Sequence, residues 1–142
     1  MAHPASRSTV GTLMADKLLD TTVLIDLSRG KVAAADFVDN ERQLGTRLFV
    51  SVVSAMELIV GCRDKAEVTK AEKQIADFQL VQLTPAISQQ AYTLVLTYSK
   101  SHGLMIPDAL IAATALTESL ELMSDNVRHF NMITGLNVSR PY

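Results

Sequence analysis

The sequence predicts an α/β fold in which a small parallel β-sheet of about four to five strands is flanked by helices on both faces. Short apolar segments alternate along the chain with longer segments of helical periodicity, which is the pattern of strands joined by helices. The apolar segments carry no polar face, as residues 48–53 illustrate, and such strands are covered on both sides. A chain of 142 residues with 48% hydrophobic residues can bury the core of one domain.

The first strand and the first two helices are predicted near the start of the chain. Residues 1–15 are small and polar and offer little to bury, so we expect a mobile N-terminal extension ahead of one domain over residues 16–142. The domain begins with the apolar pair Leu18-Leu19, which stops at Asp20 and two threonines. A hydroxyl side chain just before a segment with apolar residues at helical spacing can accept hydrogen bonds from the first free N–H groups of a helix. This break therefore predicts a strand, a turn and a short helix, followed by a second helix, with the helices at residues 22–28 and 32–44.

The later elements continue the alternation of strand and helix. The strand predicted at residues 48–53 precedes Ser54, a candidate N-cap, and a helix that ends before Gly61. We then expect a polar helix at residues 64–78, a third strand at 80–83 and a long helix at 85–102. A further helix follows at 107–120, a fourth strand at 121–123 and a candidate edge strand at 137–139.

Acidic side chains lie at or near the ends of the predicted strands. Asp20 and Asp125 come just after strands, Glu57 lies one turn into the helix after the second strand, and Asp108 lies at a helix start. Ligands collect at the carboxyl edge of a parallel sheet, so these four residues are candidates for one site. For each aspartate, a role as helix cap or as partner of the helix dipole is an equally good interpretation. Glu57 has apolar neighbours in sequence, so we expect it to need a cation or a proton.

A convergence of these acids would require a counter-charge. Three carboxylates within about 5 Å of one another repel by roughly 3 kcal/mol per pair at an effective dielectric near 20, or on the order of 10 kcal/mol in total. That sum rivals the whole stability of a domain, about 5–15 kcal/mol. Ligand sets made only of oxygen favour Mg²⁺ or Mn²⁺. Cys62 is the single cysteine, which excludes an intrachain disulfide and a cysteine-rich zinc site.

Composition limits the class of protein and the nature of its partners. A formal net charge of −2 excludes a globally basic surface for nucleic acid and leaves room only for a local patch. Ordinary surface solubility is the competing interpretation for the candidate basic residues, which are Arg29, Lys31, Arg63, Lys65 and Arg128. No apolar run approaches the roughly 20 residues of a membrane span, and no signal peptide is evident, so we expect a cytoplasmic protein.

Four blocks of sequence, at residues 18–26, 53–61, 108–115 and 124–130, match a known family in its order. The chain resembles the PIN-domain ribonucleases, and most closely the VapC-type toxins of bacterial toxin–antitoxin pairs. The resemblance implies a PIN-like fold and a metal-dependent endoribonuclease in which Asp20, Glu57 and Asp108 hold Mg²⁺ or Mn²⁺. In the last block, the family commonly has Asp or Asn two places after a hydroxyl residue, which here is Asn126, while Asp125 falls one place early. Either residue could complete the site.

The resemblance carries further expectations about auxiliary residues, chemistry and partners. Thr21, Ser124 and Asn126 are candidates for orienting water or a metal ligand. The expected reaction is hydrolysis of phosphodiester bonds in tRNA or other structured RNA, which leaves 5′-phosphate and 3′-hydroxyl ends. The expected partners are a cognate antitoxin protein and a second copy of the chain in a homodimer.

Other classes of protein fit the residues less well. A dehalogenase-like phosphatase needs Asp-x-Asp, but Thr22 occupies the second of those positions. No Gly-x-Gly-x-x-Gly or Walker-type loop is present for a nucleotide phosphate. The remaining alternative is a non-catalytic PIN-like module that binds RNA or protein without cutting, and an absence of divalent-ion binding would favour it.

Overall fold

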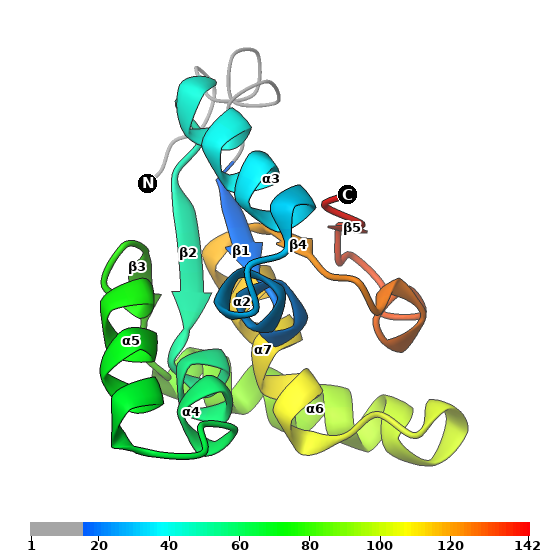
Figure 1. The fold of residues 1–142 in the computed structure, drawn as a ribbon. Helices are drawn as coiled ribbons and strands as arrows, with labels where there is room; N and C mark the ends of the chain where they lie inside the picture. The colour runs from blue at the N-terminus through cyan, green and yellow to red at the C-terminus, as the bar shows by residue number, and fades with distance from the viewer. Residues whose placement is uncertain (1–15) are drawn as a thin grey trace.

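The computed structural model describes residues 16–142, so the extension expected at residues 1–15 lies outside the described residues. A five-stranded parallel sheet in the order β3-β2-β1-β4-β5 forms the centre of the molecule (Figure 1). The strands are β1 (Lys17–Leu19), β2 (Leu48–Ser51), β3 (Gln79–Val81), β4 (Glu121–Met123) and β5 (Val138–Ser139). The helices of this part of the chain are α2 (Thr21–Ser28), α3 (Val32–Gln43), α4 (Val52–Val60), α5 (Lys65–Ile75), α6 (Pro85–His102) and α7 (Ile106–Glu118), with a short 3₁₀ turn η1 (Val127–His129).

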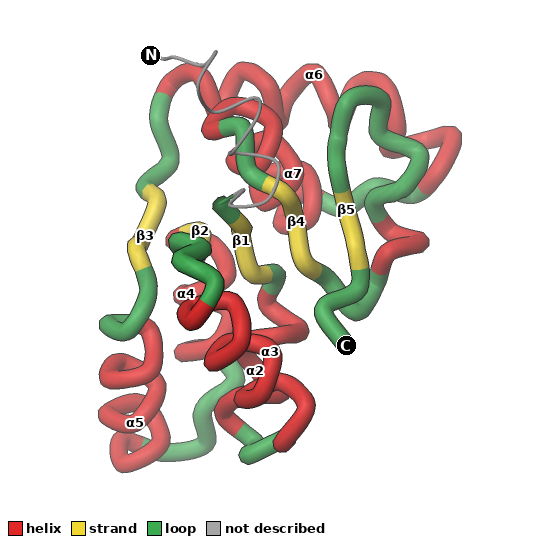
Figure 2. The backbone as a smooth tube through the Cα atoms, turned by 90° about the horizontal axis from the view of Figure 1, so that it is seen from above, coloured by secondary structure: helices red, strands yellow, loops and turns green. Residues whose placement is uncertain are grey.

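Helices cover both faces of this sheet, as the sequence predicts (Figure 2). Leu18 and Leu19 are consecutive in β1, and both are fully buried because successive side chains of a strand point to opposite faces. Leu18 packs in a cluster with residues of α6 and α7, including Ile111. Leu19 packs in a second cluster with residues of α2 to α5, including Leu24 and Leu58. The predicted α/β class and parallel sheet are therefore confirmed.

The structure corrects the prediction around the second strand. β2 ends at Ser51, and α4 begins at Val52, so the predicted strand at residues 48–53 is two residues too long. The Ser51 hydroxyl accepts a hydrogen bond from the Val53 amide and caps the helix, so the predicted N-cap at Ser54 is wrong. Val52 and Val53 have the β-branched side chains of a strand, but the cap and the packing of α4 override that preference. Ser54 is instead a fully buried residue inside the helix.

Smaller differences affect α3 and β3. Val32 and Leu44, two of the apolar residues that predict a helix at residues 32–44, are 70% and 58% exposed and do not contribute to the core. The third strand lies at Gln79–Val81, slightly earlier than predicted, and has exposed residues because β3 is at the edge of the sheet. Among the described residues, none of the helices has the length and apolar character that crossing a membrane requires.

Candidate active site

Asp20 lies at the carboxyl end of β1, the central strand, with a side chain that is almost fully buried. It occupies the N-cap position of α2, but its side chain makes no capping hydrogen bond. Its Oδ2 atom accepts hydrogen bonds from Ser124 Oγ at 2.6 Å and from Thr22 Oγ1 at 3.3 Å. The interpretation of Asp20 as an ordinary helix cap therefore does not describe its contacts, and the predicted capping by a threonine hydroxyl is also not seen.

Ser124 and Thr22 tie the turn after β4 to the start of α2. Ser124 is fully buried, and its Oγ accepts a hydrogen bond from the Asn126 amide at 2.9 Å while it donates to Asp20. Thr22 Oγ1 accepts a hydrogen bond from the Asp125 amide at 3.3 Å. Both hydroxyls thus connect Asp20 to residues 124–126, which lie in the last of the four matching sequence blocks. Thr22 was not among the predicted site residues, because a hydroxyl two places after an acid has no distinctive signal in sequence.

Glu57 lies in α4 and is oriented by Thr21, one of the predicted auxiliary residues. Thr21 Oγ1 lies 2.6 Å from Glu57 Oε1 and 2.9 Å from Ser54 Oγ. A threonine hydroxyl has one proton and a carboxylate only accepts, so the proton of Thr21 goes to Glu57. Glu57 is exposed despite its apolar neighbours in sequence, so burial gives it no need of a cation or a proton, contrary to the expectation from those neighbours. Its apolar neighbour Met56 also faces outward rather than into the core.

Asp108 lies in the first turn of α7, the helix that packs against α4 and α6. Its side chain is partly buried, with 28% of its surface exposed, and Oδ2 lies 3.7 Å from Nδ1 of the exposed His129. Burial raises the pKa of the Asp108 carboxyl, the charges of Asp20 and Glu57 raise it further, and His129 opposes the shift. Asp108 thus shares an electrostatic environment with acids that are far from it in sequence.

The charge of Glu57 acts on Asp20, and the charges of Asp20 and Glu57 act on Asp108. Burial is the main reason that the pKa of Asp20 is raised; hydrogen bonds from Ser124 and Thr22 oppose that shift, and the charge of Glu57 adds to it. Within residues 16–142, no three acidic, histidine or cysteine side chains are arranged to enclose a metal ion as they stand. Each acid instead contacts its own neighbour: Asp20 contacts Ser124, Glu57 contacts Thr21 and Asp108 contacts His129.

Asp125 and Asn126, the alternatives for the fourth acid position, have different surroundings. The Asp125 carboxylate forms an ion pair with Arg140, with Oδ1 2.7 Å from Nη1. Asn126 is exposed, and its amide donates to Ser124. Arg140 was missing from the predicted site, because nothing in the local sequence connects it to a residue 15 positions earlier.

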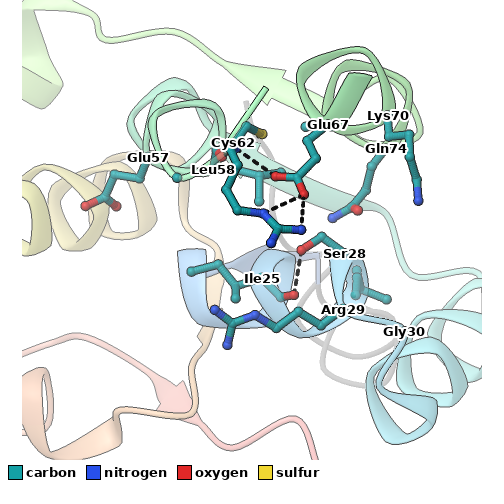
Figure 3. Close-up of a pocket in the computed structure, with 14 residues that line it drawn as sticks. Ile25, Ser28, Arg29, Gly30, Glu57, Leu58, Cys62, Glu67, Lys70 and Gln74 are labelled. Carbon is teal, nitrogen blue, oxygen red and sulfur yellow. Dashed lines mark hydrogen bonds and ion pairs between the residues drawn. The ribbon is translucent and has the colours of Figure 1, made fainter. Parts of the chain in front are cut away.

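A cleft of about 890 Å³ lies between α2, α4 and α5, with Glu57 at one end and Lys70 and Gln74 at the other (Figure 3). Of the predicted basic residues, Arg29 and Arg63 line this cleft. Arg63 is bound through Nε and Nη2 to Glu67, which reduces its availability to a ligand. The other predicted basic residues, Lys31, Lys65 and Arg128, are not among the lining residues, whereas Lys70, which was not predicted, is.

Comparison with known proteins agrees with this arrangement. The model of the PIN domain family matches residues 17–134. Ribonuclease VapC10 of Mycobacterium tuberculosis is 40% identical over 120 residues, which cover 84% of this chain and 89% of the relative. Ribonuclease VapC19 of the same species is 34% identical over 121 residues, which cover 84% of this chain and 96% of the relative.

Solved structures share the fold. A toxin–antitoxin complex from Klebsiella pneumoniae contains a chain that is 28% identical, with a TM-score of 0.73, over 89% of this chain and 98% of that one. The chain in the DNA-bound VapBC structure from Salmonella typhimurium is 20% identical, with a TM-score of 0.77, over 91% of this chain and all of that one. At that identity the second likeness concerns the fold alone. Taken together, the family match and the identity to two VapC ribonucleases establish that the chain belongs to the PIN domain family, among the VapC ribonucleases.

Proposed function

We propose that this chain is a metal-dependent endoribonuclease that cuts tRNA or other structured RNA as the toxin of a type II toxin–antitoxin system. The observation that carries the proposal is the group of three carboxylates at the carboxyl edge of the sheet, Asp20, Glu57 and Asp108, in which Glu57 raises the pKa of Asp20 and both raise the pKa of Asp108. Relatives named as VapC ribonucleases support the same reaction.

The donor set suits a hard divalent cation. All three side chains offer only oxygen, and Mg²⁺ and Mn²⁺ prefer oxygen ligands. Asp20 and Asp108 have raised pKa values, which a bound cation would reverse by favouring their ionised forms. We assign the cation to these two residues and Glu57. Asp125 and Asn126 are the candidates to complete the site, and the Arg140 ion pair, which neutralises Asp125, favours Asn126.

The proposed reaction is the hydrolysis of a phosphodiester bond. Water adds to phosphorus, the bond from phosphorus to the 3′ oxygen breaks, and the products carry 5′-phosphate and 3′-hydroxyl ends. When bound, the divalent cation neutralises phosphoryl oxygens and lowers the pKa of water. The hydrogen bonds from Ser124 and Thr22 fix the direction of the Asp20 carboxylate, and Thr21 fixes that of Glu57. These hydroxyls keep the acids oriented toward one edge of the sheet before RNA arrives.

The proposed partners are a cognate antitoxin and a second copy of the chain. The Klebsiella pneumoniae neighbour is described as a toxin–antitoxin complex, which supports an antitoxin for this chain. Large apolar side chains on α6 and at the start of α7 are exposed and would suit a dimer interface: Tyr92, Leu96, Met105 and Ile106. Ile106→Lys should then convert a dimer to a monomer in light scattering. An enzyme that acts on cellular RNA would function in the cytoplasm.

Incubation of purified protein with labelled tRNA tests the proposed function. Cleavage is expected in Mg²⁺ or Mn²⁺ and should stop when EDTA is in excess. Asp20→Asn, which keeps the size of the side chain, should abolish cleavage, whereas Asp39→Asn, the same change at an exposed position of α3, should not. Cleavage by Asp20→Asn at the normal rate would refute the assignment. RNA binding without cleavage and without divalent-ion binding in calorimetry would indicate a non-catalytic module instead.

A further inference from the structure

Arg140 leaves the sheet at the same edge as Asp20. β4 and β5 are parallel neighbours in which Met123 is paired with Ser139, and the Ser124 amide donates to the Ser139 carbonyl at 3.0 Å. Ser124 also donates its hydroxyl proton to Asp20. The residue after Ser139 is Arg140, so a guanidinium lies next to the turn that holds the central carboxylate.

The backbone at Arg140 is held on both sides. On one side, β5 pairs with β4, and on the other side Tyr142 is fixed against α2 and α3. The Tyr142 hydroxyl donates to the carboxylate of Asp26, and its ring packs edge-to-face on Phe37 with 6.3 Å between ring centroids. Lys31 Nζ lies 5.0 Å from the centre of the same ring. In Figure 2 the chain after β5 turns toward this pair of helices. Two nearby anchors leave Arg140 little backbone freedom to lose when a ligand binds.

The guanidinium of Arg140 keeps donors available. Its side chain is 58% exposed, and among residues 16–142 it bonds Asp125 through Nη1. A guanidinium has five N–H donors in a planar fork, and the fork matches two oxygens of a phosphate. Arg63 differs, since it binds Glu67 through two of its nitrogens. Asp125 thus holds Arg140 in place without occupying all of its donors.

We propose that Arg140 binds a phosphate of the RNA substrate, and that Asp125 and Tyr142 are positioning residues that hold it. The proposal rests on the proposed ribonuclease function and extends it by naming a residue that contacts substrate. The net charge of −2 and the three carboxylates repel the RNA backbone. A guanidinium held beside these carboxylates would attract a phosphate and offset part of that repulsion. Asp125 then acts through Arg140 rather than as a ligand of a metal.

The salt dependence of RNA binding tests this proposal. Binding of a fluorescently labelled tRNA would be measured by anisotropy in excess EDTA, between about 50 and 200 mM salt. Arg140→Gln should make the slope of log affinity against log salt shallower by about 0.7–0.9, the value for one phosphate contact. Arg140→Lys should restore most of the slope. The control is Arg47→Gln, because Arg47 is also 58% exposed and pairs with an aspartate, Asp16, although through both Nε and Nη2 and at the amino edge of the sheet.

Kinetics and two further variants separate substrate contact from a structural role. In Mg²⁺, Arg140→Gln should raise KM about 3- to 10-fold with kcat within about twofold, because the contact exists in both ground and transition states. Asp125→Asn should keep the wild-type salt slope, since it leaves the guanidinium charge. Tyr142→Phe, which keeps the ring on Phe37, should raise KM and also keep the slope.

The outcomes distinguish this inference from the proposed function. If wild type cleaves tRNA, Asp20→Asn is inactive and Arg140→Gln keeps both slope and KM, the inference fails and the ribonuclease assignment stands. Equal losses of affinity in Arg140→Gln and Asp125→Asn with an unchanged slope would also overturn it. If the wild type fails to cleave in Mg²⁺ and in Mn²⁺, the proposed function fails, while the salt slope still reports on the contact between Arg140 and RNA.

Discussion

Replacement of Ser124 by alanine is expected to destabilise the protein through the buried carboxylate of Asp20. The Ser124 hydroxyl donates to Asp20 Oδ2 over 2.6 Å, and both residues are buried. A hydrogen bond to a charged group contributes about 1.5–3 kcal/mol, and the Asn126 amide also loses its acceptor, for about 1 kcal/mol. We expect Ser124→Ala to lower the free energy of unfolding by about 2–4 kcal/mol at neutral pH.

Urea unfolding of the metal-free protein measures this loss. The Ser124 bond is the largest of the effects that lower the pKa of Asp20, so its removal should raise that pKa further. The stability difference between wild type and Ser124→Ala should therefore shrink as the pH falls and Asp20 takes up a proton in both proteins. A loss below about 0.5 kcal/mol at neutral pH, or one that grows in acid, would refute the reasoning.

Two controls isolate the buried bond. Ser124→Thr keeps the hydroxyl and should retain most of the stability. Ser139→Ala removes a comparable hydrogen bond, from Ser139 Oγ to Glu121 Oε2 at 2.9 Å, but the Glu121 side chain is 28% exposed and water can replace the donor. The expected loss for Ser139→Ala is about 0.5–1 kcal/mol.

Three further predictions concern protons, metal and backbone. Burial is the main reason that the pKa values of Asp20 and Asp108 are raised in the folded protein. Protonation of each carboxyl therefore stabilises the folded state fully below the ordinary aspartate pKa, and this stabilisation is lost as the pH rises through the raised pKa. In urea unfolding, metal-free wild type should therefore lose stability relative to Asp20→Asn as the pH rises. Mg²⁺ at 100 times its Kd should add about 2.7 kcal/mol, seen as a higher Tm, and a Tm unchanged by both Mg²⁺ and Mn²⁺ would contradict the proposed cation site. Gly103 ends α6 with φ of +68°, so Gly103→Ala should cost about 1 kcal/mol in thermal unfolding, whereas Gly61→Ala, at φ of −75°, should change stability by less than about 0.5 kcal/mol.

The sequence predicted the sheet and the acids at its carboxyl edge because both depend on local patterns. A buried strand has a short apolar segment, and an acid that ends it stands out, as at Asp20. The end of β2 could not be predicted, because Val52 and Val53 suit a strand by their side chains and a helix by their position after Ser51. Only the capping bond and the surrounding packing decide between the two.

Contacts between distant residues explain what the sequence did not reveal about the site. Glu57 was expected to need a cation or a proton because its neighbours are apolar, but it lies on the exposed face of α4, where an apolar neighbour, Met56, is exposed as well. The Asp125 side chain could not be assigned from its position in the motif, since its partner Arg140 lies on another strand's extension. The bond between Asp26 and Tyr142 joins residues 116 positions apart, and no periodicity reports such a pair.

The separation of 104 positions between Asp20 and Ser124 has a consequence for the chain during its synthesis. The acid at the tip of β1 is made before β4, its neighbour in the sheet, because β4 follows it by about a hundred positions along the chain. A nascent or prematurely released chain that ends before Ser124 lacks the donor that orients this carboxylate. The orientation of the carboxylate at the tip of β1 is therefore completed only after β4 and the turn that follows it have been made.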